Sequence, residues 1–170
     1  MSKEIALFVE DNYNELEFWY PFYRFQEAGY KVTIIGSGRR ESYTGKSGAL
    51  PVKEYFSADK VKAEQFAAVI VPGGYAPDLM RLSEPMVNLV REAYAQGKVV
   101  ASICHGAWML ISAGIIKGKK ATCCPHIKDD LKNAGAEYIN QEVIVDGKIV
   151  TSRVPDDLPA FCKAVLSLLG

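Results

Sequence analysis

Four short and largely apolar runs alternate with segments of helical period, and this alternation constrains the fold most. The runs occupy residues 5–9, 31–35, 67–71 and 99–103. Runs that are apolar nearly throughout are typical of strands buried on both faces of a sheet. Segments of helical period at residues 15–28 and 84–95 lie between them. The pattern predicts βαβ units, and hence a mostly parallel sheet with helices on both faces.

The C-terminal third adds a hairpin and a last helix. Residues 143–145 and 149–151 flank Asp146-Gly147, a dipeptide typical of a tight hairpin turn. Two aspartates at 156–157 suit a helix N-terminus, and the apolar segment after them runs to Leu169. No repeat, linker or low-complexity segment interrupts the chain. We therefore expect one α/β domain of three layers over residues 1–170.

The segment at residues 15–28 has two unusual features. Pro21 lies inside it, where proline kinks a helix or delays its regular part. The segment also carries more aromatic surface than one helix usually buries against one sheet. These aromatic residues are Phe18, Trp19, Tyr20, Phe22, Tyr23 and Phe25. Two interpretations stay open, a large core contact and a subunit interface, where aromatic residues are enriched.

The charge balance excludes several classes of partner. Twenty basic residues cancel twenty acidic ones, so the formal net charge is zero. Nucleic acid and anionic membranes attract proteins with a basic excess, so we expect neither as a partner. The longest apolar stretches fall far short of a bilayer span, and the acidic N-terminal region does not resemble a secretory signal. The four cysteines lack the spacing of a disulfide framework, which indicates reduced thiols in the cytoplasm.

Metal and cofactor motifs are weak. The residues that could bind a metal ion are Cys104, His105, Cys123, Cys124 and His126. No pair among them has helical or zinc-knuckle spacing, so we expect no metal, and His126 is expected in an exposed loop. The Gly-Lys-Ser sequence at 45–47 resembles the end of a P-loop, but Arg40 replaces the earlier glycine and no helix follows. We expect no cofactor.

The strongest chemical signal is the sequence Ser102-Ile103-Cys104-His105-Gly106. It lies between the apolar run at 99–103 and a helical stretch, and small residues stand two places before and two places after Cys104. A nucleophile elbow needs this order of strand, sharp turn and helix. The elbow presents Cys104 at the carboxyl edge of the sheet, near a helix N-terminus, where we expect the pKa of the thiol to fall. The alternative is a buried structural cysteine at a tight turn.

Two further segments end at the same edge of the predicted sheet. Gly73 and Gly74 follow another central strand, and their backbone N–H groups, with that of His105, could form an oxyanion hole. Glu17 stands three residues after Asn14, which is the spacing of a capping box at a helix N-terminus. Spacing alone favours this capping role. A carboxylate at that edge could also exchange a proton with the Cys104 thiol.

These motifs together resemble the ThiJ/PfpI family. The motifs are Ala101 to Gly106, Val71-Pro72-Gly73-Gly74, Glu17, and the tail from Thr151 to Pro159. The resemblance runs nearly end to end in the same order. It implies a flavodoxin-like α/β/α sandwich related to class I glutamine amidotransferases, assembled as homodimers or homohexamers.

The resemblance also implies roles for single residues. Cys104 matches the reactive nucleophile of the family, and Glu17 matches the carboxylate that hydrogen-bonds to it. His105 matches the histidine of the PfpI-type triad. Asp78 falls where PfpI-type members place an acidic residue that reaches this histidine from a neighbouring subunit. Gly74 and the His105 backbone match the oxyanion hole.

Two positions depart from the family pattern. Asn14 stands where relatives often have an acidic residue, which leaves one carboxylate near the thiol. Cys124 stands where PfpI-like members can have a tyrosine beside the pocket. A second thiol near Cys104 could form a reversible disulfide with it or protect a sulfenate.

Three functions follow as hypotheses. The first is a glyoxalase or deglycase, in which the Cys104 thiolate attacks methylglyoxal or its adducts on protein or nucleotide. The second is an intracellular cysteine peptidase, which needs His105 and Asp78 to protonate the leaving amine. The third is a non-enzymatic, redox-responsive stress protein or holdase that uses Cys104 as a sensor. Glutamine amidotransfer is excluded, because it needs a later histidine and no histidine follows His126.

Overall fold

A seven-stranded sheet forms the centre of the protein in the computed structural model, which describes residues 2–170. Its order is β10-β11-β7-β6-β1-β2-β5, and every neighbouring pair is parallel except the hairpin of β10 and β11. The strands are β1 (Glu4–Phe8), β2 (Lys31–Gly36), β5 (Phe56–Ser57), β6 (Ala68–Val71), β7 (Val99–Ile103), β10 (Val143–Asp146) and β11 (Ile149–Ser152). The four predicted strands and the predicted hairpin are confirmed.

Central strands are apolar throughout because helices cover both faces of the sheet. In β1, Leu7 pairs with Ile34 of β2 on one side and with Ile70 of β6 on the other. All three side chains are nearly inaccessible to solvent, although successive residues of a strand point to opposite faces. The absence of polar alternation in these runs therefore has a physical cause, which is burial on both sides.

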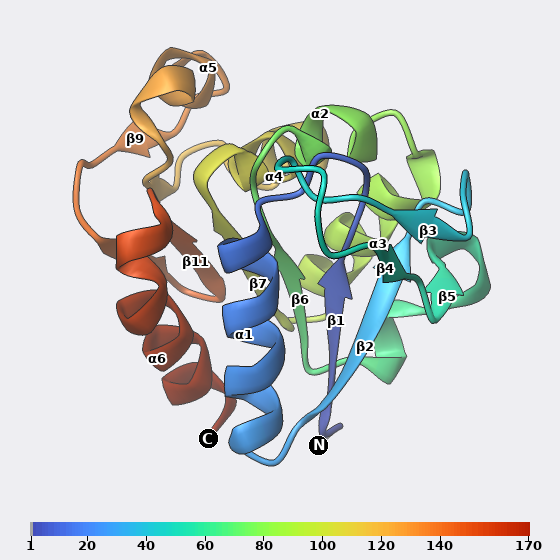
Figure 1. The fold of residues 1–170 in the computed structure, drawn as a ribbon. Coiled ribbons are helices and arrows are strands. Elements are labelled where there is room, and N and C mark those ends of the chain that lie inside the picture. The colour runs from blue at the N-terminus through green and yellow to red at the C-terminus, as the bar shows by residue number, and fades with distance from the viewer. Residues whose placement is uncertain (1) are drawn as a thin grey trace.

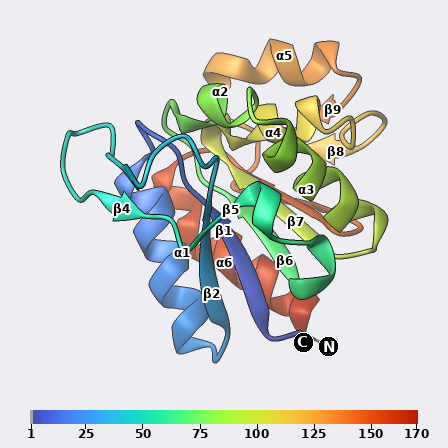
Figure 2. The same cartoon turned by 90° about the vertical axis from the view of Figure 1, so that its right-hand side faces the viewer.

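Helices form a layer on each side of this sheet (Figure 1). One layer contains α1 (Glu15–Glu27) and α6 (Leu158–Leu169), which contact each other. The opposite layer contains α3 (Glu84–Ala95), which packs on β6 and β7, and α4 (Ala107–Ser112), as the second view shows (Figure 2). The predicted flavodoxin-like sandwich is confirmed. None of the helices in residues 2–170 combines the length and the apolar character that crossing a membrane requires.

The aromatic residues of α1 divide between two surfaces. Phe18, Phe22 and Phe25 are buried in the core, whereas Tyr20 and Tyr23 are 39% and 62% exposed. Pro21 lies within the helix without ending it. The core interpretation therefore accounts for one face of α1, and an aromatic face remains uncovered on the other.

Shorter elements lie at the carboxyl edge of the sheet and beyond it. They are β3 (Ser42–Tyr43) paired with β4 (Val52–Lys53), β8 (Lys120–Ala121) paired with β9 (Glu137–Tyr138), α2 (Ala76–Met80) and α5 (Lys128–Asn133).

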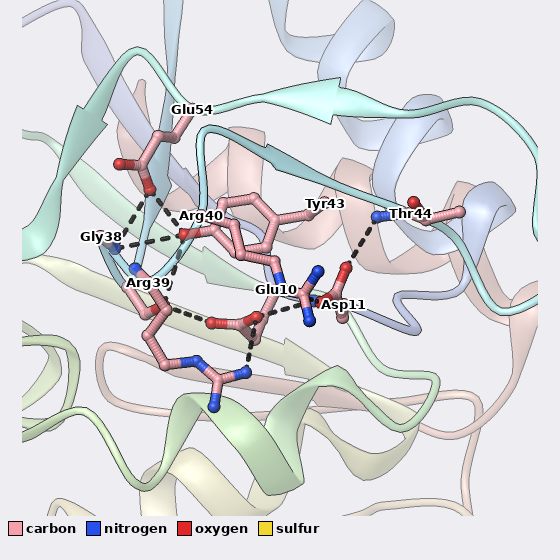
Figure 3. Close-up of polar contacts among 9 residues, drawn as sticks. Glu10, Asp11, Gly38, Arg39, Arg40, Tyr43, Thr44 and Glu54 are labelled. Carbon is pink, nitrogen blue, oxygen red and sulfur yellow. Dashed lines mark hydrogen bonds and ion pairs between the residues drawn. The ribbon is translucent and has the colours of Figure 1, made fainter.

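A polar network fixes the long loop between β2 and β5 to this edge (Figure 3). The fully buried Glu10 carboxylate, just after β1, forms an ion pair with Arg39 at 3.3 Å. The Tyr43 hydroxyl donates to Glu54 at 2.9 Å within the same loop. Because the buried carboxylate is paired, the loop is held against the end of β1. It thereby brings residues 45–47 to the mouth of the site described below.

Candidate active site

Cys104 lies at the predicted elbow, directly between β7 and α4. Its backbone has a φ of +59°, in the left-handed region that non-glycine residues rarely adopt. The turn that follows, Cys104–Gly106, is 3₁₀-helical and leads into α4. A Cβ at Gly106 would lie 2.5 Å from the Val71 carbonyl oxygen, so the close approach of β6 requires glycine there. The predicted elbow is confirmed, and its strain is of a kind concentrated at functional sites.

Glu17 contacts the elbow and does not cap its helix. Asn14 caps α1, because its side-chain oxygen accepts from the N–H groups of Leu16 and Glu17 at 3.1 and 3.4 Å. The capping box is not closed, however, since the Asn14 N–H donates to the Gly73 carbonyl at 3.1 Å. The Glu17 carboxyl instead accepts from the Gly73 N–H at 2.7 Å. The preference for a capping role, drawn from spacing, is wrong.

Gly73 lies where the carboxyl group of Glu17 and the side chain of Cys104 converge. A Cβ at Gly73 would be 2.5 Å from Glu17 Oε2 and 2.7 Å from Cys104 Cβ. Glu17 is fully buried, and its Oε1 has no hydrogen-bond partner among residues 2–170. A buried carboxyl group with an unpaired oxygen beside a thiol is arranged to exchange or share a proton.

Two of the three predicted oxyanion donors remain available. The Gly73 N–H donates to Glu17, so the expectation for Gly73 is wrong. The N–H groups of Gly74 and His105 have no acceptor in the hydrogen bonds described for residues 2–170, and both residues line one cavity with Cys104. Gly74 has a φ of +78°, and a Cβ there would lie 2.4 Å from the Asn12 carbonyl oxygen.

A second thiol faces the same histidine as Cys104. Cys104 Sγ lies 3.3 Å from His105 Nδ1, and Cys124 Sγ lies 3.4 Å from the same nitrogen. These three atoms all lie within 4.8 Å of one another. Cys124 is far from the other two residues in the sequence because α4 and β8 intervene, so no local spacing predicts this cluster.

The ionisable groups of the site perturb one another. Burial, and then the charge of Cys104, raise the pKa of Glu17 to about 8. The hydrogen bond to Cys124 and then burial raise the pKa of Cys104 to about 12, although His105 opposes this. The pKa of Cys124 is lowered, first by its hydrogen bond with Cys104. Two adjacent thiols resist ionising together. The expected fall in the pKa of Cys104 is therefore wrong.

A cavity of about 500 Å³ opens onto these groups. Its lining includes Lys46 and Ser47 from the loop after β2, Tyr75, Pro125, His126, Val154 and Pro155. His126 is exposed, as expected, and its ring lies over that of His105 with centroids 6.1 Å apart. Sequence reasoning missed the place of His126 and Lys46 at this cavity, since only the folding of distant loops brings them there.

Asp78 does not join the site within one chain. It is exposed on α2, it does not line the cavity, and it has no hydrogen bond or ion pair with His105. Its predicted contact comes from a neighbouring subunit and stays a prediction.

Comparison with known protein families leads to the same family as the site geometry. The profile of the DJ-1/PfpI family matches residues 3–168. The chain belongs to the DJ-1/PfpI family. The predicted resemblance is thereby confirmed, and with it the expectation of a cysteine-dependent enzyme of this family.

The relatives carry names that bear on function. Deglycase PH1704 of Pyrococcus horikoshii is 44% identical over 166 residues, which cover 98% of this chain and 99% of the relative. Protein/nucleic acid deglycase 2 of Escherichia coli is 43% identical over 171 residues, covering 100% and 99% of the two chains. A crystal structure of a two-domain protein from Anabaena variabilis, with DJ-1/ThiJ/PfpI-like and ferritin-like domains, is 41% identical, with a TM-score of 0.96. The match covers 99% of this chain and 48% of that one.

Proposed function

We propose that the protein is a cysteine-dependent deglycase or glyoxalase that acts on methylglyoxal or its early adducts. The observation that carries this proposal is the buried Glu17 carboxyl group, packed against Cys104 with one oxygen unpaired. The names of the relatives support the same substrate class.

The first step is addition of the Cys104 thiol to the aldehyde. The sulfur forms a bond to the carbonyl carbon, and the electron pair of the C=O bond moves to oxygen, which takes up the thiol proton. The free N–H groups of Gly74 and His105 stabilise the negative charge that develops on this oxygen. The product is a hemithioacetal.

Glu17 then moves a proton between two carbons. Its pKa of about 8 lies near neutral pH, so both its acid and its base forms are accessible. The carboxylate removes the proton from the former aldehyde carbon, and the acid returns it to the adjacent carbon. The hydroxyl proton on the former aldehyde oxygen passes to the former ketone oxygen, which gives a thioester. Water cleaves this ester to lactate and frees Cys104. Lactic acid is an isomer of hydrated methylglyoxal, so the reaction needs no oxidant or reductant.

Peptide hydrolysis has weaker support. An amine leaving group must be protonated, and the proposed acid, His105, faces two thiols within one chain while Asp78 lies apart. This activity would depend on a neighbouring subunit that brings Asp78 to His105.

The test is lactate production from methylglyoxal, measured with free thiols removed from the buffer. We expect multiple turnovers by the wild-type protein, none by Cys104→Ser, and strong slowing in Glu17→Gln. Glu27→Gln is the matched control for activity, because Glu27 lies at the other end of the same helix, pairs with Arg24 and does not line the cavity. Modification of one equivalent of Cys104 without turnover would contradict the enzyme and favour the redox-responsive stress protein.

We also infer that the protein works in the cytoplasm as a homodimer or homohexamer. The support is the uncovered face of α1, where Leu16 and Tyr23 are 63% and 62% exposed. With no net charge, nucleic acid and membranes are not expected to bind it. Sedimentation of the wild-type protein and of Tyr23→Glu tests the assembly, and a wild-type monomer at micromolar concentration would contradict it.

A further inference from the structure

Three soft ligand atoms converge at the cavity. They are the sulfurs of Cys104 and Cys124 and the Nδ1 atom of His105, which all lie within 4.8 Å of one another. The Nδ1 atom lies almost equally far from both sulfurs, at 3.3 and 3.4 Å. Neither thiol is in a disulfide. Thiolate and imidazole are the ligands that zinc and related ions prefer.

Two sides of this triangle have the dimensions of a metal site. In tetrahedral zinc sites the Zn–S and Zn–N bonds are about 2.3 and 2.0 Å, which places sulfur and nitrogen about 3.5 Å apart and two sulfurs about 3.8 Å apart. The observed distances from sulfur to nitrogen are within about 0.2 Å of this value. The third side, between the two sulfurs, is at most 4.8 Å, so side-chain rotations can bring both sulfurs to an ion bound at Nδ1.

We propose that Cys104, His105 and Cys124 bind one thiophilic metal ion, of which Zn²⁺ is the representative. Binding forms two metal–sulfur bonds and one metal–nitrogen bond, and releases the two thiol protons to solvent. Two thiolates neutralise the charge of Zn²⁺, and the ion removes the repulsion that otherwise keeps the two thiols from ionising together.

The site has an entrance and an open fourth position. All three residues line the cavity, and Cys104 and His105 are partly exposed to it. The exposed His126 lies over the ring of His105, so a water molecule or the His126 imidazole can complete the tetrahedron. Three protein ligands with an open position are typical of accessible zinc sites and differ from closed structural sites of four ligands.

This site would compete with the chemistry proposed above. An ion bound to the Cys104 sulfur occupies the electron pair that attacks the aldehyde. Metal binding does not depend on that chemistry, however, and it can be measured without substrate. Failure of one proposal is therefore distinguishable from failure of the other.

The experiment is a titration of the phosphine-reduced, metal-free protein with Co²⁺, followed by displacement with Zn²⁺. Thiolate coordination to Co²⁺ gives a near-ultraviolet charge-transfer band that carboxylate or surface histidine sites do not give. We expect one ion per chain and a band that Zn²⁺ abolishes. Calorimetric titration with Zn²⁺ then gives the affinity of each variant.

Cys124→Ser and Cys104→Ser should each lose most or all of the band. Each variant should also bind Zn²⁺ at least about 100-fold more weakly, because loss of a direct ligand costs no less than loss of an outer-shell partner, for which about 100-fold is the upper end. Cys123→Ser is the matched control, since Cys123 is adjacent to Cys124 but does not line the cavity. Cys162→Ser controls for a buried thiol elsewhere. Circular dichroism verifies the fold of each variant. Wild-type affinity in Cys124→Ser, or absence of the band in the reduced wild-type protein, would overturn the proposal.

Discussion

Replacing Glu17 by glutamine should raise stability while it removes activity. Glu17 is fully buried, and its pKa is about 8 against an ordinary value of 4.5. The folded protein therefore holds a proton at pH values where the unfolded chain has lost it, so unfolding becomes easier as pH rises from 4.5 to 8. Each pH unit costs about 1.4 kcal/mol, which amounts to about 3 kcal/mol at pH 7 and approaches about 5 kcal/mol above pH 8.

Glutamine keeps the shape and the acceptor for the Gly73 N–H but cannot ionise. Glu17→Gln should therefore unfold at higher urea concentration than the wild-type protein at pH 7, with little difference at pH 4. The corresponding rise in Tm is roughly 10 °C at pH 7, at a few degrees per kcal/mol for a chain of this size. Lactate production should fall by about 10²- to 10⁴-fold, the usual contribution of a general acid–base group.

Urea unfolding at pH 4, 7 and 8.5 measures the effect, with Glu15→Gln as the control. Burial opposes the shift, but hydrogen bonds from Ser47 lower the pKa of Glu15, so the control should lose a little stability above pH 4.5 and gain none. The claim that burial holds Glu17 protonated would be refuted if Glu17→Gln gained no free energy of unfolding. It would also be refuted if the gain were equal at all three pH values.

Three further substitutions test the framework around the site. Gly74→Ala places a Cβ 2.4 Å from the Asn12 carbonyl oxygen at a φ of +78°, so we expect a loss of about 2 kcal/mol or more in unfolding free energy, together with reduced turnover. Asn14→Ala removes the cap of α1 and should cost about 1 kcal/mol by thermal unfolding, with Asn14→Ser restoring most of it. Asp157→Asn breaks the bidentate contacts with Arg153, at 2.9 and 3.0 Å, and chemical unfolding should show a loss of about 2 kcal/mol, whereas an unchanged midpoint would mean that the pair contributes nothing.

The fold was predictable because its signals are local. The apolar runs that form β1, β6 and β7 are buried on both faces, so composition alone marks them as strands of a covered parallel sheet. The elbow was predictable for a similar reason. A Cβ added at Gly106 would lie 2.5 Å from the Val71 carbonyl oxygen. This close packing restricts position 106, two residues after Cys104, to glycine. The resemblance to a known family then identified the sandwich as flavodoxin-like.

The interior of the site was less predictable, because it depends on contacts between distant segments. Glu17 has the spacing of a capping residue, and only the approach of Gly73 to the start of α1 turns its carboxyl group toward the thiol. The same hydrogen bond removes Gly73 from the oxyanion hole. Cys124 reaches the site across a long connection, and its hydrogen bond with Cys104 reverses the expected direction of the shift in the pKa of Cys104.

The raised pKa of Cys104 bears on the choice between a peptide amide and an aldehyde as the substrate. The hydrogen bond with Cys124 and burial raise the pKa of Cys104, which favours its neutral thiol. Attack on an amide requires a strong nucleophile together with an acid that is oriented toward the departing amine. Cys104 favours the neutral thiol, and within one chain Asp78 does not line the cavity and does not orient His105. Addition to an aldehyde needs a weaker nucleophile and no acid for a leaving group, because the aldehyde carbonyl is more electrophilic and no group departs. The thiol proton passes to the new hydroxyl group, so Cys104 need not be ionised beforehand. The second thiol that weakens the argument for a peptidase is thus compatible with a deglycase, and it also supplies the additional ligand for a metal ion.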